Sequence, residues 1–202
     1  EKNAGISDAS NDALQMARGE FVGLLDHDDV LHTDALAEVV AAIRNDHEID
    51  MVYTDEDKIL PDGITHGIPF FKPDWAPDTF FSVMYTCHFG VYRKSVLEAI
   101  GGFRKGFDGA QDYDMVLRFT EKARKIHHIP RVLYHWRMAP SSTARDPFAK
   151  TYAYQSARNA ICESLTNRGF HVTVEDGICI GNYRVRYLHD QWPCIDIIIP
   201  NK

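Results

Sequence analysis

The sequence predicts an α/β fold, in which helices and strands alternate along the chain. One observation is the apolar run of residues 21–25, which has the length of a strand buried on both faces and ends in Asp26, Asp28 and Asp29. Another is that the hydrophobic period on either side of this run is that of a helix. Because ligands gather beyond the carboxyl ends of strands in open α/β sheets, we expect a functional site at these acids.

The remaining elements follow from apolar spacing and from start and stop signals. Ser7 or Ser10 can cap the first helix, which Gly19 ends. A second strand also ends in acids, so we expect two acidic strand ends to face one cleft. The expected elements are helix 12–18, strand 21–25, helix 34–43, strand 50–54, strand 87–92, a short helix ending at Gly101-Gly102, helix 111–119, strand 126–137, a helix from Pro147 to about Asn167 and two strands within 170–188.

Two loops have distinctive compositions. Pro61-Asp62-Gly63 predicts a turn, and with it a hairpin or lid, because Pro presets the first turn angle and Gly tolerates positive φ. Residues 70–77 contain too much proline for regular structure. Their aromatic side chains predict a packed loop or a wall on which a sugar stacks, and packing is the commoner use of aromatic residues.

The acids after the first strand predict a metal site. Asp26 and Asp28 are close enough at a strand-to-loop bend to share Mg²⁺ or Mn²⁺, whose coordination substrate phosphates would complete. Capping of the next helix by Asp29 or Thr33 is the alternative, but it explains only one acid. Neighbouring carboxylates repel one another unless a cation neutralises them. The pattern therefore favours a metal-assisted enzyme acting on a diphosphate.

The helix at residues 111–119 carries a candidate general base. Met115, Val116 and Phe119 form its expected core face, and Asp112 lies near its N-terminus, where the helix dipole keeps an acid ionised. An ionised carboxylate there can accept a proton from a hydroxyl. The alternative is that Asp112 or Asp114 is simply a favourable charge in the first turn.

The strand at residues 126–137 leads into a loop that can bind phosphate. Arg137 and the hydroxyls that follow it can hold a diphosphate leaving group, and His135 is a candidate third metal ligand. His127 and His128 point to opposite faces of a regular strand, so we interpret them as structural.

Composition limits the class of protein. The chain has 202 residues, 45% hydrophobic and 25% charged, which suits one sizeable core. A net charge of -7 argues against broad nucleic-acid binding. The 4 cysteines form no CxxC pair, which indicates neither a zinc site nor a disulfide framework and favours a reducing cytoplasm. No apolar run approaches the roughly 20 residues of a membrane span, and there is no signal peptide, so we expect at most peripheral membrane association.

Both ends of the sequence look like cut ends. The chain opens without Met in an apparent functional loop, and residues 194–200 have the pattern of another buried strand. We therefore expect an N-terminally truncated domain at residues 1–188. Residues 189–202 would be a linker and the first strand of a second domain.

Taken together, the motifs resemble family 2 glycosyltransferases of the GT-A fold over nearly the whole chain to Leu188. The motifs are Asn3-Ala4-Gly5, Asn11, Ala17-Arg18-Gly19-Glu20-Phe21, Leu25-Asp26-His27-Asp28-Asp29, Gly109-Ala110-Gln111-Asp112-Tyr113-Asp114 and Tyr134-His135-Trp136-Arg137. The chain is most similar to bacterial tandem-domain members that build O-antigen or other surface polysaccharides. The resemblance implies a GT-A-like (Rossmann-like) mixed sheet flanked by helices and lacking its first strands.

The resemblance also implies an inverting, metal-dependent transfer from a nucleotide-diphosphate sugar to a glycan or lipid-linked acceptor, in the cytoplasm or at the inner face of the membrane. It implies that Asp26 and Asp28 form a DxD metal motif for Mn²⁺ or Mg²⁺, that Asp112 is the base, that Arg137 and Ser142 contact the donor diphosphate, and that Asn3, Gly5 and Asn11 lie near the nucleotide. The candidate acceptor-binding residues are Asp55, Asp57, Trp75 and His88.

The sequence differs from the family pattern in two motifs, and two other functions are also compatible with it. Gln111-Asp112 replaces the Glu-Asp of many members, and the QxxRW motif of processive synthases is absent, which favours single sugar additions. The apolar strand and Asp26-x-Asp28 also resemble the first motif of haloacid-dehalogenase-like Mg²⁺ phosphatases, in which the first Asp is the nucleophile. A catalytically inactive module that binds nucleotide sugars is the third reading.

Overall fold

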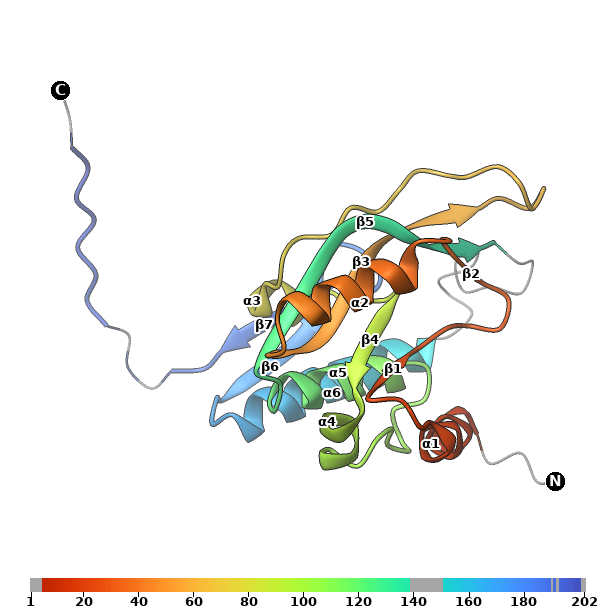
Figure 1. Cartoon of the computed structure of the whole chain (residues 1–202). Coiled ribbons are helices and arrows are strands. Elements are labelled where there is room, and N and C mark those ends of the chain that lie inside the picture. Colours follow the sequence, from red (N-terminus) through yellow and green to blue (C-terminus); the bar gives the residue numbers. More distant parts are fainter. Residues whose placement is uncertain (1–4, 139–150, 190, 192, 201–202) are drawn as a thin grey trace.

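A five-stranded mixed sheet with helices on both faces forms the centre of the structure, a computed structural model that describes residues 5–138, 151–189, 191 and 193–200 (Figure 1). In chain order the elements are α1 (Ile6–Met16), β1 (Phe21–Gly23), β2 (Val30–Leu31), α2 (Ala35–Asn45), β3 (Ile49–Ile59), α3 (Pro77–Phe80), β4 (Gly90–Arg93), α4 (Lys94–Ala99), α5 (Gln111–Thr120), β5 (Lys125–Arg137), α6 (Thr151–Asn167), β6 (Val172–Asp176) and β7 (Tyr183–Tyr187). The predicted α/β alternation is confirmed.

The sheet has the strand order β1-β4-β3-β5-β2, and β6 and β7 form a separate antiparallel pair. The two long strands, β3 and β5, are parallel neighbours, whereas β4 is antiparallel to β1 and β3, and β2 is antiparallel to β5. The pairing of β3 with β5 reaches Ile59 and Arg137, so the carboxyl ends of both strands lie side by side.

The core has two layers, one on each face of the sheet. On one face, Met51 and Tyr53 of β3 pack with Met115 and Phe119 of α5. On the other face, α2 covers β3 and β5, and Val39 packs in the same cluster as the strand residues there (Figure 1). The predicted core residues of α5, including Val116, are buried as expected.

Several boundaries differ from those predicted, each for a local reason. The N-cap of the first helix is Gly5, whose φ is 95°, and not a serine. Ser7 lies inside the helix, and its Oγ donates to the carbonyl of Arg104 (3.1 Å). Among the described residues no side chain caps α2, so the alternative in which Asp29 or Thr33 serves as its cap is not borne out. Strand β1 is a short, partly exposed edge strand, and not one that is buried on both faces.

The second acidic motif lies inside a strand and not after one. Strand β3 continues to Ile59, so Asp55, Glu56 and Asp57 are buried within it. The predicted turn at residues 61–63 is confirmed, and the chain returns along β3 through antiparallel bridges from Glu56 to Phe70 and from Ile59 to His66. This hairpin supplies partners that the sequence pattern did not reveal.

The C-terminal segment also differs from the prediction. Residues 193–200 form no strand, and the side chains of Ile195, Ile197, Ile198 and Ile199 are exposed. The assignment of residues 189–202 to a second domain therefore stays a prediction. In the described ranges, no helix combines the length and the apolar character needed to cross a membrane.

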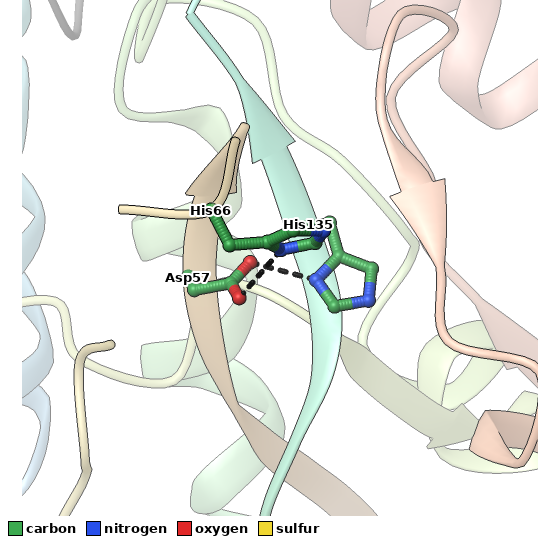
Figure 2. A group of neighbouring side chains, drawn as sticks. All are labelled: Asp57, His66 and His135. Carbon is green, nitrogen blue, oxygen red and sulfur yellow. Dashed lines mark hydrogen bonds and ion pairs between the residues drawn. The ribbon is translucent and has the colours of Figure 1, made fainter. Parts of the chain in front are cut away.

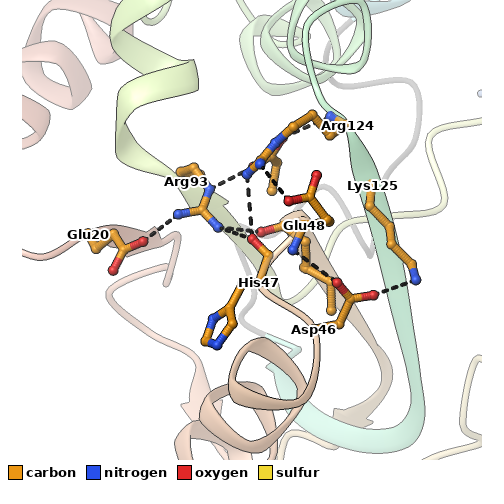
Figure 3. A network of polar contacts seen from close by, with 9 residues as sticks. Glu20, Asp46, His47, Glu48, Arg93, Arg124 and Lys125 are labelled. Carbon is orange, nitrogen blue, oxygen red and sulfur yellow. Dashed lines mark hydrogen bonds and ion pairs between the residues drawn. The ribbon is translucent and has the colours of Figure 1, made fainter.

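Asp50 holds three strands together at the end of the sheet opposite the acidic loop. Its side chain is only 1% exposed, and its two oxygens accept hydrogen bonds from Arg93 Nε (2.6 Å) and from Arg124 N, Nε and Nη2 (2.8, 3.1 and 2.7 Å). Figure 3 shows the surrounding network, in which Arg93 also reaches Glu20 and the carbonyl of His47. Burial alone would raise the pKa of Asp50, but the bonds from Arg124 and Arg93 outweigh it and lower the pKa to about 2.

We expect Asp50→Asn to destabilise the protein by about 2–3 kcal/mol, because the change removes the charge that satisfies two arginines. The folded pKa lies below the ordinary value, so the stability that Asp50 contributes is present above pH ~4 and is lost as the pH falls toward ~2. Urea denaturation at pH 7 and at pH 3 measures both effects.

The matched control is Glu20→Gln, which removes an acid that contacts the same Arg93 but is 73% exposed. It should cost less than about 1 kcal/mol. Equal losses for the two variants would contradict the role assigned to Asp50.

Candidate functional site

The acidic loop after β1 is fastened to the end of β5 by Asp29. Asp29 Oδ1 accepts a hydrogen bond from the backbone N–H of Arg137 (2.7 Å), and the hydroxyl of Tyr134 donates to Oδ2. Burial raises the pKa of Asp29 in spite of these bonds. Asp29 therefore anchors the loop and leaves Asp26 and Asp28, which are 64% and 40% exposed, to face solvent.

Arg137 shapes the same loop. Its Nε donates to the carbonyl of Asp28 (2.8 Å), and its backbone N–H is the donor to Asp29. The guanidinium therefore lies beside the acidic loop, at the edge where β3 and β5 end. Its predicted contact with a donor diphosphate stays a prediction, and Ser142 lies outside the described residues.

His88 lies between the acidic loop and the buried acid Glu56. Its Nε2 is 3.7 Å from Asp26 Oδ2, its Nδ1 is 3.7 Å from Glu56 Oε2, and its ring stacks on Tyr134 at a centroid distance of 4.9 Å. Burial by itself lowers the pKa of His88, but the carboxylates of Glu56, Asp26 and Asp112 outweigh it, so the pKa is raised. The acids around His88 therefore favour its protonated form, whose positive charge would offset part of the negative charge at this site.

A buried lysine, Lys72, joins Glu56 to the backbone of His88. Lys72 Nζ donates to Glu56 Oε2 (3.1 Å) and to the carbonyl of His88, and its side chain has no exposed surface. Neither Lys72 nor Glu56 was among the residues predicted for the site. The available signal was a lone lysine within the aromatic segment 70–75, since a lysine among apolar residues needs a buried acid as its partner.

Asp112 reaches the same region from the first turn of α5. Its Oδ1 accepts a hydrogen bond from the N–H of Tyr113 (2.8 Å), and the thiol of Cys87 lies 3.5 Å from Oδ2. Cys87 directly precedes His88 in the chain, so this thiol links Asp112 to the surroundings of Asp26. Asp114, in contrast, is buried and paired with Arg104 and Arg118, which makes it the structural acid of this helix.

Asp112 also lines a cavity of about 190 Å³. The other lining residues are Met84, Gly109, Ala110, Tyr113, Ala153, Tyr154, Ala157, Gly181 and Tyr183. A larger hollow of about 880 Å³, which shares Tyr183 with this cavity, lies against α3, β7 and the turn between β6 and β7. That hollow contains none of the predicted site residues, so we base the site on the acidic loop and Asp112.

Of the four predicted acceptor-binding residues, only His88 lies beside the acidic loop. Asp55 is buried, accepts a hydrogen bond from the N–H of Lys72 (2.9 Å) and pairs with His128 Nε2 (2.8 Å). Trp75 packs against Phe80 at a ring distance of 5.1 Å, which supports the packed-loop interpretation. Asp57 is bonded to two histidines. These three side chains are already engaged within the protein, so the geometry does not support their predicted role.

Of the residues predicted to lie near the nucleotide, those within the described ranges have structural roles. The side chain of Asn11 forms a pair of hydrogen bonds with the backbone of Phe103, Nδ2 to O and N to Oδ1, each 2.8 Å long. Gly102 permits this approach, because a Cβ there would lie 2.4 Å from Asn11 Oδ1. Gly5 is the N-cap of α1, and Asn3 lies outside the described residues. The geometry therefore gives Asn11 a role in packing α1 and does not support nucleotide binding by it.

His135 is grouped with other residues than Asp26 and Asp28. Its Nδ1 lies 2.6 Å from Asp57 Oδ1, and His66 Nδ1 lies 2.8 Å from Asp57 Oδ2 (Figure 2). Among the His, Cys, Asp and Glu side chains in the part of the chain that the structure describes, these three form the one group whose potential metal-ligand atoms all lie within 4.8 Å of one another. The prediction that His135 shares a cation with Asp26 and Asp28 is not supported by this arrangement.

The sequence matches one family model and is similar to several bacterial proteins. The sequence model described as "Glycosyl transferase family 2" matches residues 1–101. The chain is 43% identical over its whole length to the uncharacterized protein y4gI of Sinorhizobium fredii, and 40% identical over 96% of its length to the O-antigen biosynthesis protein RfbC of Myxococcus xanthus. It spans only 22% and 15% of those relatives.

A solved structure shares the fold. The crystal structure of Staphylococcus aureus TarS 1-349 in complex with UDP-GlcNAc matches with a TM-score of 0.62 and 20% identity. The match covers 81% of this chain and 47% of that one. The mixed sheet with helices on both faces is therefore shared with that protein.

We expect Asn11→Ala to destabilise the protein by about 1–3 kcal/mol, because it leaves the backbone N–H and carbonyl of Phe103 without partners. Affinity for nucleoside diphosphates should not change. Asn159→Ala is the matched control, since Asn159 is an exposed residue of α6 whose side chain accepts a hydrogen bond from the exposed Gln155 one turn earlier. Weaker nucleotide binding with unchanged stability would return Asn11 to a ligand-binding role.

Proposed function

The chain belongs to glycosyl transferase family 2, and we propose that it transfers a sugar, with inversion at the anomeric carbon, from a nucleotide-diphosphate donor to a glycan or lipid-linked acceptor. Its fold is the expected GT-A fold, and the family match sets aside the phosphatase reading. RfbC is named for O-antigen biosynthesis, which supports a role of this chain in surface polysaccharide synthesis.

The observation that carries the proposal is the linked placement of Asp26, His88 and Asp112. His88 lies 3.7 Å from Asp26, and Cys87, its neighbour in the chain, lies 3.5 Å from Asp112. Asp26, the proposed metal ligand, and Asp112, the acid at the helix terminus, thereby lie on either side of one short segment. A donor on the first acid and an acceptor hydroxyl at the second would lie next to each other, which is the positioning that group transfer needs.

The donor set at Asp26 and Asp28 suits Mn²⁺ or Mg²⁺. Both carboxylates are partly exposed, and the partners described for them are histidines at 3.7 and 3.8 Å, so their oxygens can turn toward a hard cation. When bound, the cation would stabilise the negative charge of the departing nucleoside diphosphate. Arg137, whose Nε bonds the carbonyl of Asp28, is proposed to add a second positive charge, and Asn3, Gly5 and Ser142 are proposed to complete donor binding.

Asp112 is proposed to accept the proton of the acceptor hydroxyl. Burial raises the pKa of the Cys87 thiol, so this thiol stays neutral and can donate to Asp112 without competing as a base. The dipole of α5 favours the ionised form of a carboxylate in its first turn. The alternative that Asp112 is only a first-turn charge predicts no effect on transfer.

Several further properties are proposed on the same basis. The absence of a QxxRW motif supports single sugar additions. A cytoplasmic location with peripheral association at the inner face of the membrane would bring the site to lipid-linked acceptors. Because the relatives are several times longer than this chain, their additional length supports a second glycosyltransferase domain in the complete protein.

We expect Asp28→Ala to lower the Mn²⁺-dependent affinity for nucleoside diphosphates by at least about tenfold, because it removes one of the two proposed ligands. The fold should persist, since Asp28 is partly exposed. Isothermal titration with UDP, GDP and dTDP, with and without Mn²⁺, measures the effect.

Asp34→Ala, which removes a more exposed acid six residues further on, is the control and should bind like the wild type. If the unaltered protein bound nucleotides equally well with and without Mn²⁺, the metal role of Asp26 and Asp28 would be excluded.

We expect Asp112→Asn to lower the rate of sugar transfer by roughly 10²-fold or more with nearly unchanged donor affinity, since the amide keeps the shape but cannot accept the proton. The measurement is nucleotide release from a panel of nucleotide sugars in the presence of acceptor. Asp108→Asn, an exposed acid on the approach to α5, is the matched control.

Wild-type turnover in Asp112→Asn would refute the base assignment. Metal-dependent nucleotide binding without any transfer in the unaltered protein would instead favour the inactive binding module.

A further inference from the structure

Asp57, His66 and His135 converge from three segments of the chain. Asp57 lies on β3, His135 is its direct neighbour in the parallel β3–β5 ladder, and His66 lies on the returning arm of the hairpin after β3. Each oxygen of the Asp57 carboxylate faces one imidazole, at 2.6 Å from His135 Nδ1 and 2.8 Å from His66 Nδ1 (Figure 2). The two rings meet edge to face with centroids 4.6 Å apart.

Two side chains of this group are largely buried, and the third is accessible to solvent. The side chains of Asp57 and His135 are 11% and 12% exposed, and that of His66 is 48% exposed. Strand pairing positions the first two, whereas His66 is held by the bridge to Ile59 and by the bond from Gly67 N to the carbonyl of Lys58 (2.7 Å). Solvent therefore reaches the group from the side of His66.

The chemistry of the group fits a borderline metal ion. Without a metal, the contacts are those of two imidazole N–H groups that donate to one carboxylate. Two neutral imidazoles and one carboxylate are also a common ligand set for Zn²⁺, which leaves a fourth position for water. Ligand atoms around a tetrahedral Zn²⁺ lie about 3.3 Å apart, whereas the two histidine nitrogens lie 2.6 and 2.8 Å from the carboxylate. Side-chain rotations that move His135 Nδ1 by roughly 0.7 Å and His66 Nδ1 by roughly half an ångström away from Asp57 would admit the ion.

We propose that Asp57, His66 and His135 form a second cation site, which takes Zn²⁺ in preference to Mg²⁺ and fastens the hairpin of residues 59–70 to β5. Binding replaces the two N–H···O hydrogen bonds by coordinate bonds: each imidazole stays neutral, its proton moves from Nδ1 to Nε2 by exchange with solvent, and the Nδ1 lone pair binds the ion. The site is separate from Asp26 and Asp28 and does not depend on the proposed transfer reaction.

The experiment is a Zn²⁺ titration of the metal-free protein, followed by calorimetry and, with Co²⁺ as a substitute, by visible absorption. In a variant with both Asp26→Ala and Asp28→Ala, one Zn²⁺ site should remain. His66→Gln and His135→Gln should each weaken that site by at least about tenfold. The control is His32→Gln, which alters a histidine whose ring lies 5.9 Å from that of His135 but which is outside the group.

A stabilising role gives a second readout. Zn²⁺ should raise the thermal unfolding midpoint of the unaltered protein and of His66→Cys, which keeps a zinc ligand, but not that of His66→Gln. Loss of all Zn²⁺ binding in the Asp26/Asp28 variant, or unchanged binding in His66→Gln, would overturn the proposal. Mn²⁺-dependent nucleotide binding by His66→Gln reports separately on the proposed function, so the two can fail independently.

Discussion

The parallel pairing of β3 with β5 is the constraint on which the rest of the structure depends. Parallel strands place their carboxyl ends at one edge of a sheet, and here the two strands stay paired as far as Ile59 and Arg137. The pairing brings Asp55 to His128 and Asp57 to His135. It also provides the end of β5 to which Asp29 attaches the acidic loop, so the position of Asp26 and Asp28 follows from a ladder that contains neither residue.

The acids of this chain divide according to whether the protein already satisfies them. Asp50 and Asp114 are buried between arginines, and Glu56 faces Lys72, as expected for charges that are removed from water. The carboxylates of Asp26 and Asp28 lie 3.7 and 3.8 Å from histidine nitrogens and remain open to solvent. The carboxylates left for chemistry are those that the fold does not use for its own stability, and the paired ones give the surroundings a fixed charge arrangement.

Local patterns predicted the elements that local patterns determine. The helical period of α5 and the length of β5 were readable because burial of one face repeats along each element. The burial of Asp55, Glu56 and Asp57 was not, since their partners come from a hairpin and from β5. The packing role of Asn11 could not be predicted either, because its partner Phe103 lies 92 residues away and a single long-range hydrogen bond produces no periodic pattern in the sequence. The candidate base Asp112 was accessible from sequence because a helix terminus is a local feature, whereas the grouping of His66 with Asp57 and His135 required the three-dimensional register.

The exposed isoleucines near the C-terminal end have a practical consequence. Ile195, Ile197, Ile198 and Ile199 are between 76% and 88% exposed in a segment with high strand propensity and a single acid, Asp196. Such a segment is a template for intermolecular cross-β stacking. The adjacent exposed Cys194 adds a thiol that can crosslink two copies under oxidising conditions. Preparations of this chain will therefore aggregate with increasing concentration unless another surface covers these residues and a reductant is present.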